Sequence, residues 1–347
     1  MAAVLSEPEI FQGILNLAKE NLTSEEINKM LLVTDNEGRT VFHVAANRYE
    51  TVIFQEILNL AKEELTSEEI NKMLLVTDNE GRTVLHVAAK RTNPEIFQEI
   101  LNLAKKKLTS KEVNKMLLVT DNKGRTVFHV AAERSEPEKF QRILNLAKEK
   151  LTREEVNKML LETDNEGRTV FHVAAELSKP NEFQGILNLL KENLITEEVN
   201  KMLLATDNEG RTVFHVAAER SEQKKFQRIL NFAKQKLTRE EVNRMLLATD
   251  NEGSTVFHMA GVLFEPEIFQ GILNLVKENL TKVEVNKILL TTDNKGRTVF
   301  HVAAKLSKPD KFQGILNLVE ENLTTEEVNK MLLATDNKGN TVFHVAA

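Results

Sequence analysis

The sequence predicts an all-α solenoid of about eight stacked repeats, and three observations support this prediction. The thirteen residues that begin at Thr34, TDNEGRTVFHVAA, return with few changes every 43 residues along the 347-residue chain. All eight histidines occupy one position of this period, and all six prolines occupy another. A fixed period of about 20–50 residues is typical of solenoids, in which each repeat packs only on its neighbours. We therefore expect residues 1–347 to form a single repeat array.

The copy that begins at Thr163 shows the first elements of a repeat in order. Asp, Asn and Gly cluster in TDNEG, which predicts a tight turn, and the alanine-rich segment RTVFHVAAE after it is expected to form a short helix. Ser178 is then a candidate N-cap and Pro180 a first helical residue, because the N–H that proline lacks would be unpaired there. One copy earlier, Ser135 and Glu138 match the Ser-x-x-Glu capping box.

Two further helices complete the repeat. Residues 137–151 carry one apolar stripe at helical spacing, which predicts an amphipathic helix. The residues of this stripe are Phe140, Ile143, Leu144, Ala147 and Leu151. Thr152 and Glu155 form a second capping box and begin a third helix. The expected buried face of this third helix comprises Val156, Met159 and Leu160.

The segment DNEGRTVFHVAA resembles the opening of an ankyrin repeat, whose family pattern is Asp-x-x-Gly-x-Thr-Pro-Leu-His-x-Ala-Ala. The matching residues in the copy from Thr163 are Asp164, Gly167, Thr169, Phe171, His172, Ala174 and Ala175. Val170 departs from the family proline, and the period of 43 exceeds the usual length of about 33, which a longer second helix and the additional third helix account for. The resemblance implies an ankyrin-type α-solenoid in which Asp and Gly form a finger turn, while Thr and His tie that turn to the first helix.

Composition argues against several classes of partner. The net charge of −6 shows no basic footprint for nucleic acid, and the chain has no cysteine. No apolar run approaches the roughly 18 residues of a membrane span, and the N-terminus lacks the pattern of a signal peptide. We therefore expect a cytoplasmic protein with neither nucleic acid nor membrane as a partner.

The sequence offers no constellation for catalysis, cofactor binding or metal binding. The histidines lie one repeat apart, about 10 Å, which is too far for two of them to ligate one ion. They are expected to be structural residues of the finger. No nucleophile–base pair is evident, so we expect no enzymatic activity. The asparagines that recur in the second helix (Asn16, Asn59 and Asn145) are expected to form buried hydrogen-bonding ladders between repeats.

In ankyrin-type arrays the finger tips and the exposed end of the first helix form the binding surface, and here the finger tips barely vary. Variation is concentrated directly after the Ala-Ala pair, where leucine, arginine and aromatic residues alternate between copies. Aromatic residues and arginine are enriched at interaction hot spots. Drift at the loosest part of the repeat explains the variation equally well. The candidate partner-binding residues are Arg48, Tyr49, Arg91, Arg134, Leu177, Arg220, Leu263, Phe264 and Leu306.

Three functional interpretations follow from these patterns. The first is a non-catalytic scaffold that binds a protein partner of unknown identity. The second is a structural spacer, or an array that assembles end to end. The third is the targeting arm of a larger protein, such as a bacterial effector delivered into a host cell, with its activity outside this segment.

The ends and one interior repeat add two expectations. Met1 and Ala347 both fall within the first helix of a repeat, so we expect either a segment of a longer array or self-association through uncapped ends. The repeat around Ser254 departs most from the pattern, because Gly261, Phe264 and Val283 replace residues that favour its helices. We expect this repeat to be the least stable interior one.

Overall fold

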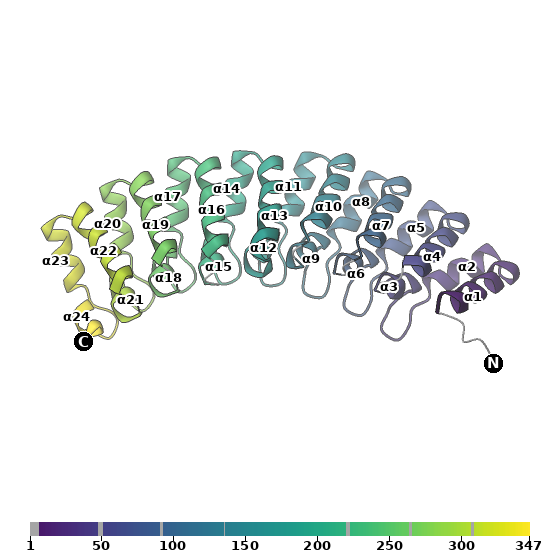
Figure 1. The fold of residues 1–347 in the computed structure, drawn as a ribbon, viewed down its shortest axis with the longest axis horizontal. Coiled ribbons are helices and arrows are strands. Elements are labelled where there is room, and N and C mark those ends of the chain that lie inside the picture. Colours follow the sequence, from purple (N-terminus) through teal and green to yellow (C-terminus); the bar gives the residue numbers. More distant parts are fainter. Residues whose placement is uncertain are drawn as a thin grey trace. The chain divides into compact units, whose positions relative to one another are not determined.

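The computed structural model describes residues 7–47, 51–90, 93–134, 136–219, 223–263, 266–306 and 309–347. The chain divides into two compact halves, Met1–Asn165 and Glu166–Ala347, and each is described by itself. Both halves repeat one sequence of elements, in which a long helix, a capped helix, a finger turn and a short helix follow one another (Figure 1). Each 43-residue repeat thus contains the three helices that the sequence pattern predicts.

The long helices begin at or next to the conserved proline position, where proline supplies a suitable φ at the first helical turn. They are α1 (Glu7–Asn21), α4 (Thr51–Glu64), α7 (Pro94–Lys107) and α10 (Pro137–Lys150) in the N-terminal half, and α13 (Pro180–Asn193), α16 (Gln223–Lys236), α19 (Pro266–Asn279) and α22 (Pro309–Asn322) in the C-terminal half.

The capped helices are α2 (Ser24–Leu32), α5 (Ser67–Leu75), α8 (Ser110–Leu118), α11 (Arg153–Leu161), α14 (Thr196–Leu204), α17 (Arg239–Leu247), α20 (Lys282–Leu290) and α23 (Thr325–Leu333). The capping box predicted for α11 is present. The Thr152 N–H donates to Glu155 Oε2 at 2.8 Å, and the Glu155 N–H donates to Thr152 Oγ1 at 3.3 Å. These bonds satisfy two backbone donors that the first turn of a helix leaves without partners.

The short helices are α3 (Val41–Ala46), α6 (Val84–Lys90), α9 (Val127–Glu133), α12 (Val170–Leu177), α15 (Val213–Glu219), α18 (Val256–Leu263), α21 (Val299–Leu306) and α24 (Val342–Ala346). Within each half, equivalent helices of successive repeats lie side by side, as α6 and α9 do, or α18 and α21 (Figure 1). Isolated bridges between threonines close the base of several fingers, for example Thr249 with Thr255.

The core runs between the short and long helices of each half. Four of the five predicted stripe residues of α10 are buried, and only Leu151, at the C-cap, is partly exposed. The rings of Phe128 and Phe140 pack edge to face with centroids 5.3 Å apart. Val156, Met159 and Leu160 are buried as predicted.

Two predictions about the long helices need correction. Pro180 is the first residue of α13, so the N-cap is Lys179, and Ser178 instead ends α12 by donating its N–H to Ala174 O at 3.1 Å. Helix α10 likewise has Glu136 at its N-cap. Ser135, the predicted partner of Glu138, lies outside the described residues.

The predicted asparagine ladder is wrong in its position. Asn16 and Asn145 are exposed, and each accepts a hydrogen bond from the glutamine four residues earlier in its own helix. A different asparagine position, in the capped helices, connects the repeats. Asn71 Nδ2, for example, donates to Glu112 Oε1 at 3.0 Å. Spacing alone placed Asn16 on a helix but did not determine which side of that helix faces the next repeat.

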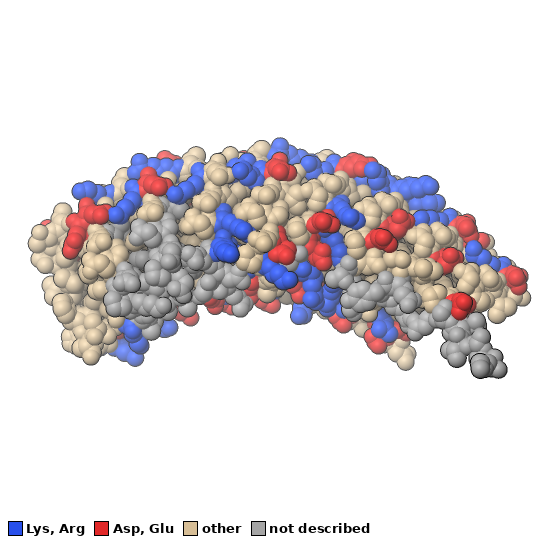
Figure 2. All heavy atoms as spheres, viewed as in Figure 1, with Lys and Arg blue, Asp and Glu red and all other residues tan. Residues whose placement is uncertain are grey.

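Across the described part of the chain, no helix is both long and apolar enough to cross a membrane. Within each half, the face visible in Figure 2 carries acidic and basic side chains interspersed.

Candidate partner-binding surface

The finger turn is built by one aspartate and one glycine. Asp78 Oδ1 accepts the N–H groups of Glu80 and Arg82 at 3.0 and 2.9 Å, while the Gly81 N–H donates to Asp78 O at 2.9 Å. Gly81 has φ of 75°, a left-handed conformation that only glycine adopts at little cost. The resemblance to ankyrin repeats correctly implied these two roles.

The finger arginine is held by carboxylates of its own repeat. Arg125 Nε donates to Asp121 Oδ2 at 2.9 Å, and its Nη1 pairs with Glu133 in the last turn of α9. Although burial alone would raise the pKa of Asp121, the hydrogen bonds from Arg125 outweigh it and hold that pKa below its ordinary value. Sequence analysis missed the pairing of finger arginine with Glu133, which lies eight residues further along the chain.

Successive fingers are joined by backbone groups. The Asn122 N–H donates to Glu80 O at 2.8 Å, and its side-chain Nδ2 donates to Asn79 O at 2.9 Å. A Cβ built on Gly81 would lie 2.8 Å from the Asn122 backbone nitrogen, so a side chain there would push the fingers apart. Stacking therefore explains why Asp, Asn and Gly recur in every copy of the finger.

In six of the repeats the histidine connects its own finger to the next one. The Thr83 N–H donates to His86 Nδ1 at 3.4 Å, which leaves the proton on Nε2, and His86 Nε2 donates to Arg125 O at 3.1 Å. Burial lowers the pKa of His86 from 6.5 to about 4, so the ring is neutral at pH 7. Within the described ranges, no group of three or more histidine or acidic residues is placed to hold a metal ion.

The structure gives side-chain positions for two of the predicted partner-binding residues. Arg134 is the C-cap of α9 and is exposed, and Leu177 is the last residue of α12 with 45% of its surface exposed. Both therefore lie at the C-terminal end of a short helix. Leu263 and Leu306 end α18 and α21, but their side chains lie outside the described set. The remaining candidates, which fall wholly outside the described residues, are Arg48, Tyr49, Arg91, Arg220 and Phe264.

Two lysines that are buried among the described residues were not anticipated. Lys139 Nζ donates to Ala88 O at 3.2 Å, at the C-terminal end of the short helix of the preceding repeat, and Lys225 Nζ donates to Ala175 O at 3.0 Å. A cation is favoured there by the helix dipole. Burial lowers the pKa of Lys139. The available signal was a lysine in a position that holds buried Ile96 one copy earlier.

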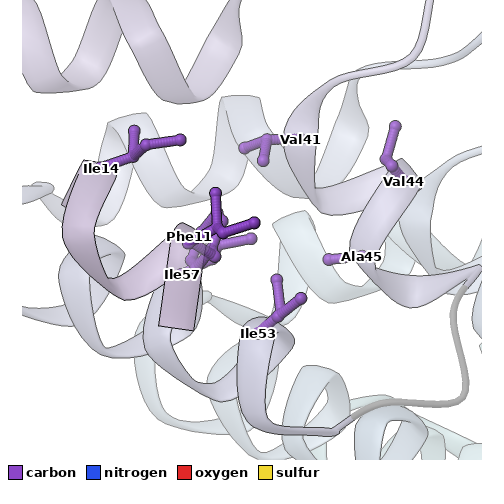
Figure 3. A pocket seen from close by; sticks show the side chains of 8 residues that line it. Phe11, Ile14, Val41, Val44, Ala45, Ile53 and Ile57 are labelled. Atoms are coloured by element: carbon purple, nitrogen blue, oxygen red, sulfur yellow. The ribbon is translucent and has the colours of Figure 1, made fainter. Parts of the chain in front are cut away.

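The first described repeat carries an open apolar cavity of about 300 Å³ between α1, α3 and α4 (Figure 3). It is lined by Ile10, Phe11, Ile14, Val41, Val44, Ala45, Ile53 and Ile57. Ile14 is 58% exposed, whereas its equivalent one repeat later, Ile57, is 1% exposed. The difference arises because α1 covers α4 within this half, and no described element covers α1 in the same way.

Comparison with known proteins agrees with this architecture. Residues 1–111 match the family of ankyrin repeats (three copies). The chain is similar to the crystal structure of the ankyrin repeat domain of Bcl-3, a unique member of the IkappaB protein family. The match has a TM-score of 0.54 at 19% identity and covers 81% of this chain and 100% of that one. No curated protein matches.

Residues 1–111 therefore belong to the ankyrin-repeat family, and the following repeats continue the same fold. The prediction of an all-α, ankyrin-type solenoid with three helices and a finger in each repeat is confirmed. Ankyrin repeats generally serve as modules that bind other proteins.

Proposed function

We propose that the chain is a non-catalytic scaffold that binds a protein partner along the finger side of its short helices. One observation carries this proposal. The invariant finger residues, such as Asp78, Gly81 and His86, are all used in bonds within the array, so their constancy has a structural cause. The positions that vary, such as Arg134 and Leu177, are exposed, so packing between repeats does not restrict which residue they carry.

The experiment replaces Arg91, Arg134 and Arg220 together by alanine. Partners captured from the source cell by the unchanged chain are identified by mass spectrometry, and affinity for one purified partner is then measured for the variant. We expect weaker binding with unchanged helical content, because the three arginines lie outside the predicted core.

The matched control replaces Lys115, Lys158 and Arg244 by alanine. These exposed residues lie on the capped helices, and their replacement removes the same total charge as the triple arginine variant. Affinity that falls equally in both variants would indicate a general charge effect. Affinity that is unchanged in the arginine variant would assign the variation to drift.

A second candidate function is end-to-end assembly, as in the spacer interpretation. It is favoured by the exposure of apolar residues in the first and last described repeats. Ile14 is 58% exposed on α1, while Leu333 and Phe343 are 73% and 69% exposed on α23 and α24. We propose that these faces of two copies pack together, since interior repeats bury their equivalents of Ile14 against a neighbour.

Light scattering over a concentration series tests this assembly. The mass should rise with concentration for the unchanged chain, and Ile14→Lys should keep it at that of one chain. An exposed-site control, Lys106→Glu, should not alter the mass. A constant monomer mass for the unchanged chain at high concentration would refute assembly.

A further inference from the structure

Two repeats lack the arginine that closes the other fingers. In the finger of residues 335–341 Asn340 replaces it, and Asn340 Nδ2 still donates to Asp336 Oδ2 at 3.1 Å. Ser254 occupies the position of Arg211 and Arg297 in the adjacent repeats. Its N–H still donates to Asp250 Oδ1 at 2.8 Å, so the finger turn is kept. Within the part of the chain that the structure describes, Asp250 Oδ2 has no hydrogen-bond or ion-pair partner, whereas Asp293 Oδ2 accepts from Arg297 Nε at 2.7 Å.

The missing side chain leaves a cavity of about 550 Å³ in the C-terminal half. This volume lies in the range of about 300–1,000 Å³ typical of ligand sites. Asp250 and Ser254 line it, together with the apolar side chains of Met259 and Val302. Three further carboxylates line the cavity: Glu209, Glu219 and Glu252.

The charges of the neighbouring groups are already balanced except at Asp250. Arg211 and Arg297 also line the cavity. The Arg211 guanidinium pairs with Asp207, Glu209 and Glu219 at 2.8, 3.2 and 2.6 Å, and the Arg297 guanidinium pairs with Asp293 at 2.6 Å. Burial raises the pKa of Asp250, in contrast to the lowered pKa of the arginine-paired Asp293. The cavity therefore holds an acidic group that is more exposed than its counterparts in the adjacent repeats and lacks their cation.

The other repeats show which cation fits this carboxylate. Nε and Nη2 of the finger arginine both contact Oδ2 of the aspartate, at 2.8 and 2.7 Å for Arg82 and at 2.9 and 2.8 Å for Arg211. The planar guanidinium makes both contacts at once, which a lysine ammonium cannot do with one nitrogen. The arginines of the other fingers thus show which group this aspartate carboxylate is shaped to bind.

We propose that the cavity at Asp250 binds the guanidinium group of an arginine from a partner protein, in the place that the repeat's own arginine takes elsewhere. The apolar walls contact the methylene groups of that arginine, and Asp250 Oδ2 accepts its two N–H groups. This inference deepens the proposed function by naming one group of the partner. Its test needs no partner protein, so the two proposals can fail separately.

The test titrates the full chain with the tripeptide acetyl-Gly-Arg-Gly-amide. Amide chemical shifts of Glu252 and Ser254 are followed, because both N–H groups donate to Asp250 Oδ1. The matched peptide carries citrulline, which has nearly the shape of arginine but no charge. We expect saturable shifts with the arginine peptide and binding about tenfold weaker with the citrulline peptide, since charge-assisted hydrogen bonds are the stronger ones.

Three variants locate the site. Ser254→Arg restores the residue that six of the other repeats carry and should abolish binding by filling the cavity. Asp250→Asn keeps an oxygen for both finger N–H groups and should weaken binding about tenfold. Asp121→Asn, at a carboxylate that Arg125 already occupies, should leave binding unchanged. Equal affinity for both peptides, or undiminished binding by Ser254→Arg, would overturn the proposal.

Discussion

Replacing Gly81 by alanine tests how much of the array's stability depends on contact between fingers. Two separate costs are expected at this position. The first is strain, because Gly81 has φ of 75° and an L-residue in this conformation costs about 1–2 kcal/mol. The second is steric, because the new Cβ would lie 2.6 Å from Asn122 Oδ1 and 2.8 Å from its backbone nitrogen.

The steric cost can be estimated from the bonds that must yield. A rotation of the Asn122 side chain does not relieve the contact with its backbone nitrogen. The fingers therefore separate and lose the bonds from Asn122 N–H to Glu80 O and from Asn122 Nδ2 to Asn79 O, at 2.8 and 2.9 Å. At about 0.5–1.5 kcal/mol for each bond, the loss is about 1–3 kcal/mol beyond the strain.

Gly339 provides the matched control. Its φ is 79°, and no atom of the described chain lies within 4 Å of a Cβ built on it. Gly339→Ala should therefore cost the strain alone, and both variants share the effect of alanine on the unfolded chain. Because repeats open locally, native-state hydrogen exchange is the appropriate assay.

The Asn122 amide should exchange faster in Gly81→Ala than in the unchanged chain. Gly81→Ala should lower the free energy of local opening, measured at the Asn122 amide. Gly339→Ala should lower the corresponding free energy, measured at the amide of residue 339, by about 1–3 kcal/mol less, which is about 5–150-fold in the opening equilibrium. Equal costs would refute the reasoning, because they would show that the contact between fingers contributes nothing beyond the turn.

Three further predictions follow. Burial lowers the pKa of His86 and His215 from 6.5 to about 4, so protons bind more tightly to the unfolded chain. The free energy of unfolding should therefore be full above pH 6.5 and fall by about 3 kcal/mol per histidine as the pH drops to about 4. Denaturant titrations that give the same free energy of unfolding throughout this pH range would contradict the prediction. Ile195→Thr should stabilise α14 by about 1 kcal/mol, since Glu198 already accepts the Ile195 N–H at 2.9 Å and only the side-chain half of the box is missing; an unchanged melting temperature would count against this. Hydrogen exchange should be fastest, among interior repeats, across residues 254–283, whereas uniform protection there would show that packing outweighs the lost local interactions.

Sequence reasoning succeeded where the determining interactions are local. The finger depends on Asp78 and Gly81, three residues apart, and the capping box on Thr152 and Glu155, also three apart. Such signals are contained in a few letters, and the period then repeats them through the chain. The buried faces of the long and capped helices followed from helical periodicity for the same reason.

Other features depend on how one repeat packs against the next, which the sequence pattern does not predict. Lys139 is buried because its long helix reaches the end of a short helix about 50 residues earlier. Asn16 was assigned to the wrong side because helical spacing gives the apolar face but not the direction of the neighbouring repeat. The replacement of the finger arginine by Ser254 is visible in the sequence, but the cavity beside it could be recognised only in the structure.

The histidine bonds between fingers affect how the number of repeats can change during evolution. His215 donates to the backbone carbonyl of Ser254 at 3.1 Å, and His301 to that of Asn340 at 3.1 Å, the same distance as from His172 to Arg211 O. The acceptor is main chain, so the joint is indifferent to which side chain the following repeat carries. Whole 43-residue segments can therefore be gained, lost or exchanged by recombination without redesign of their contacts, and the number of repeats can evolve independently of the surface that each one displays.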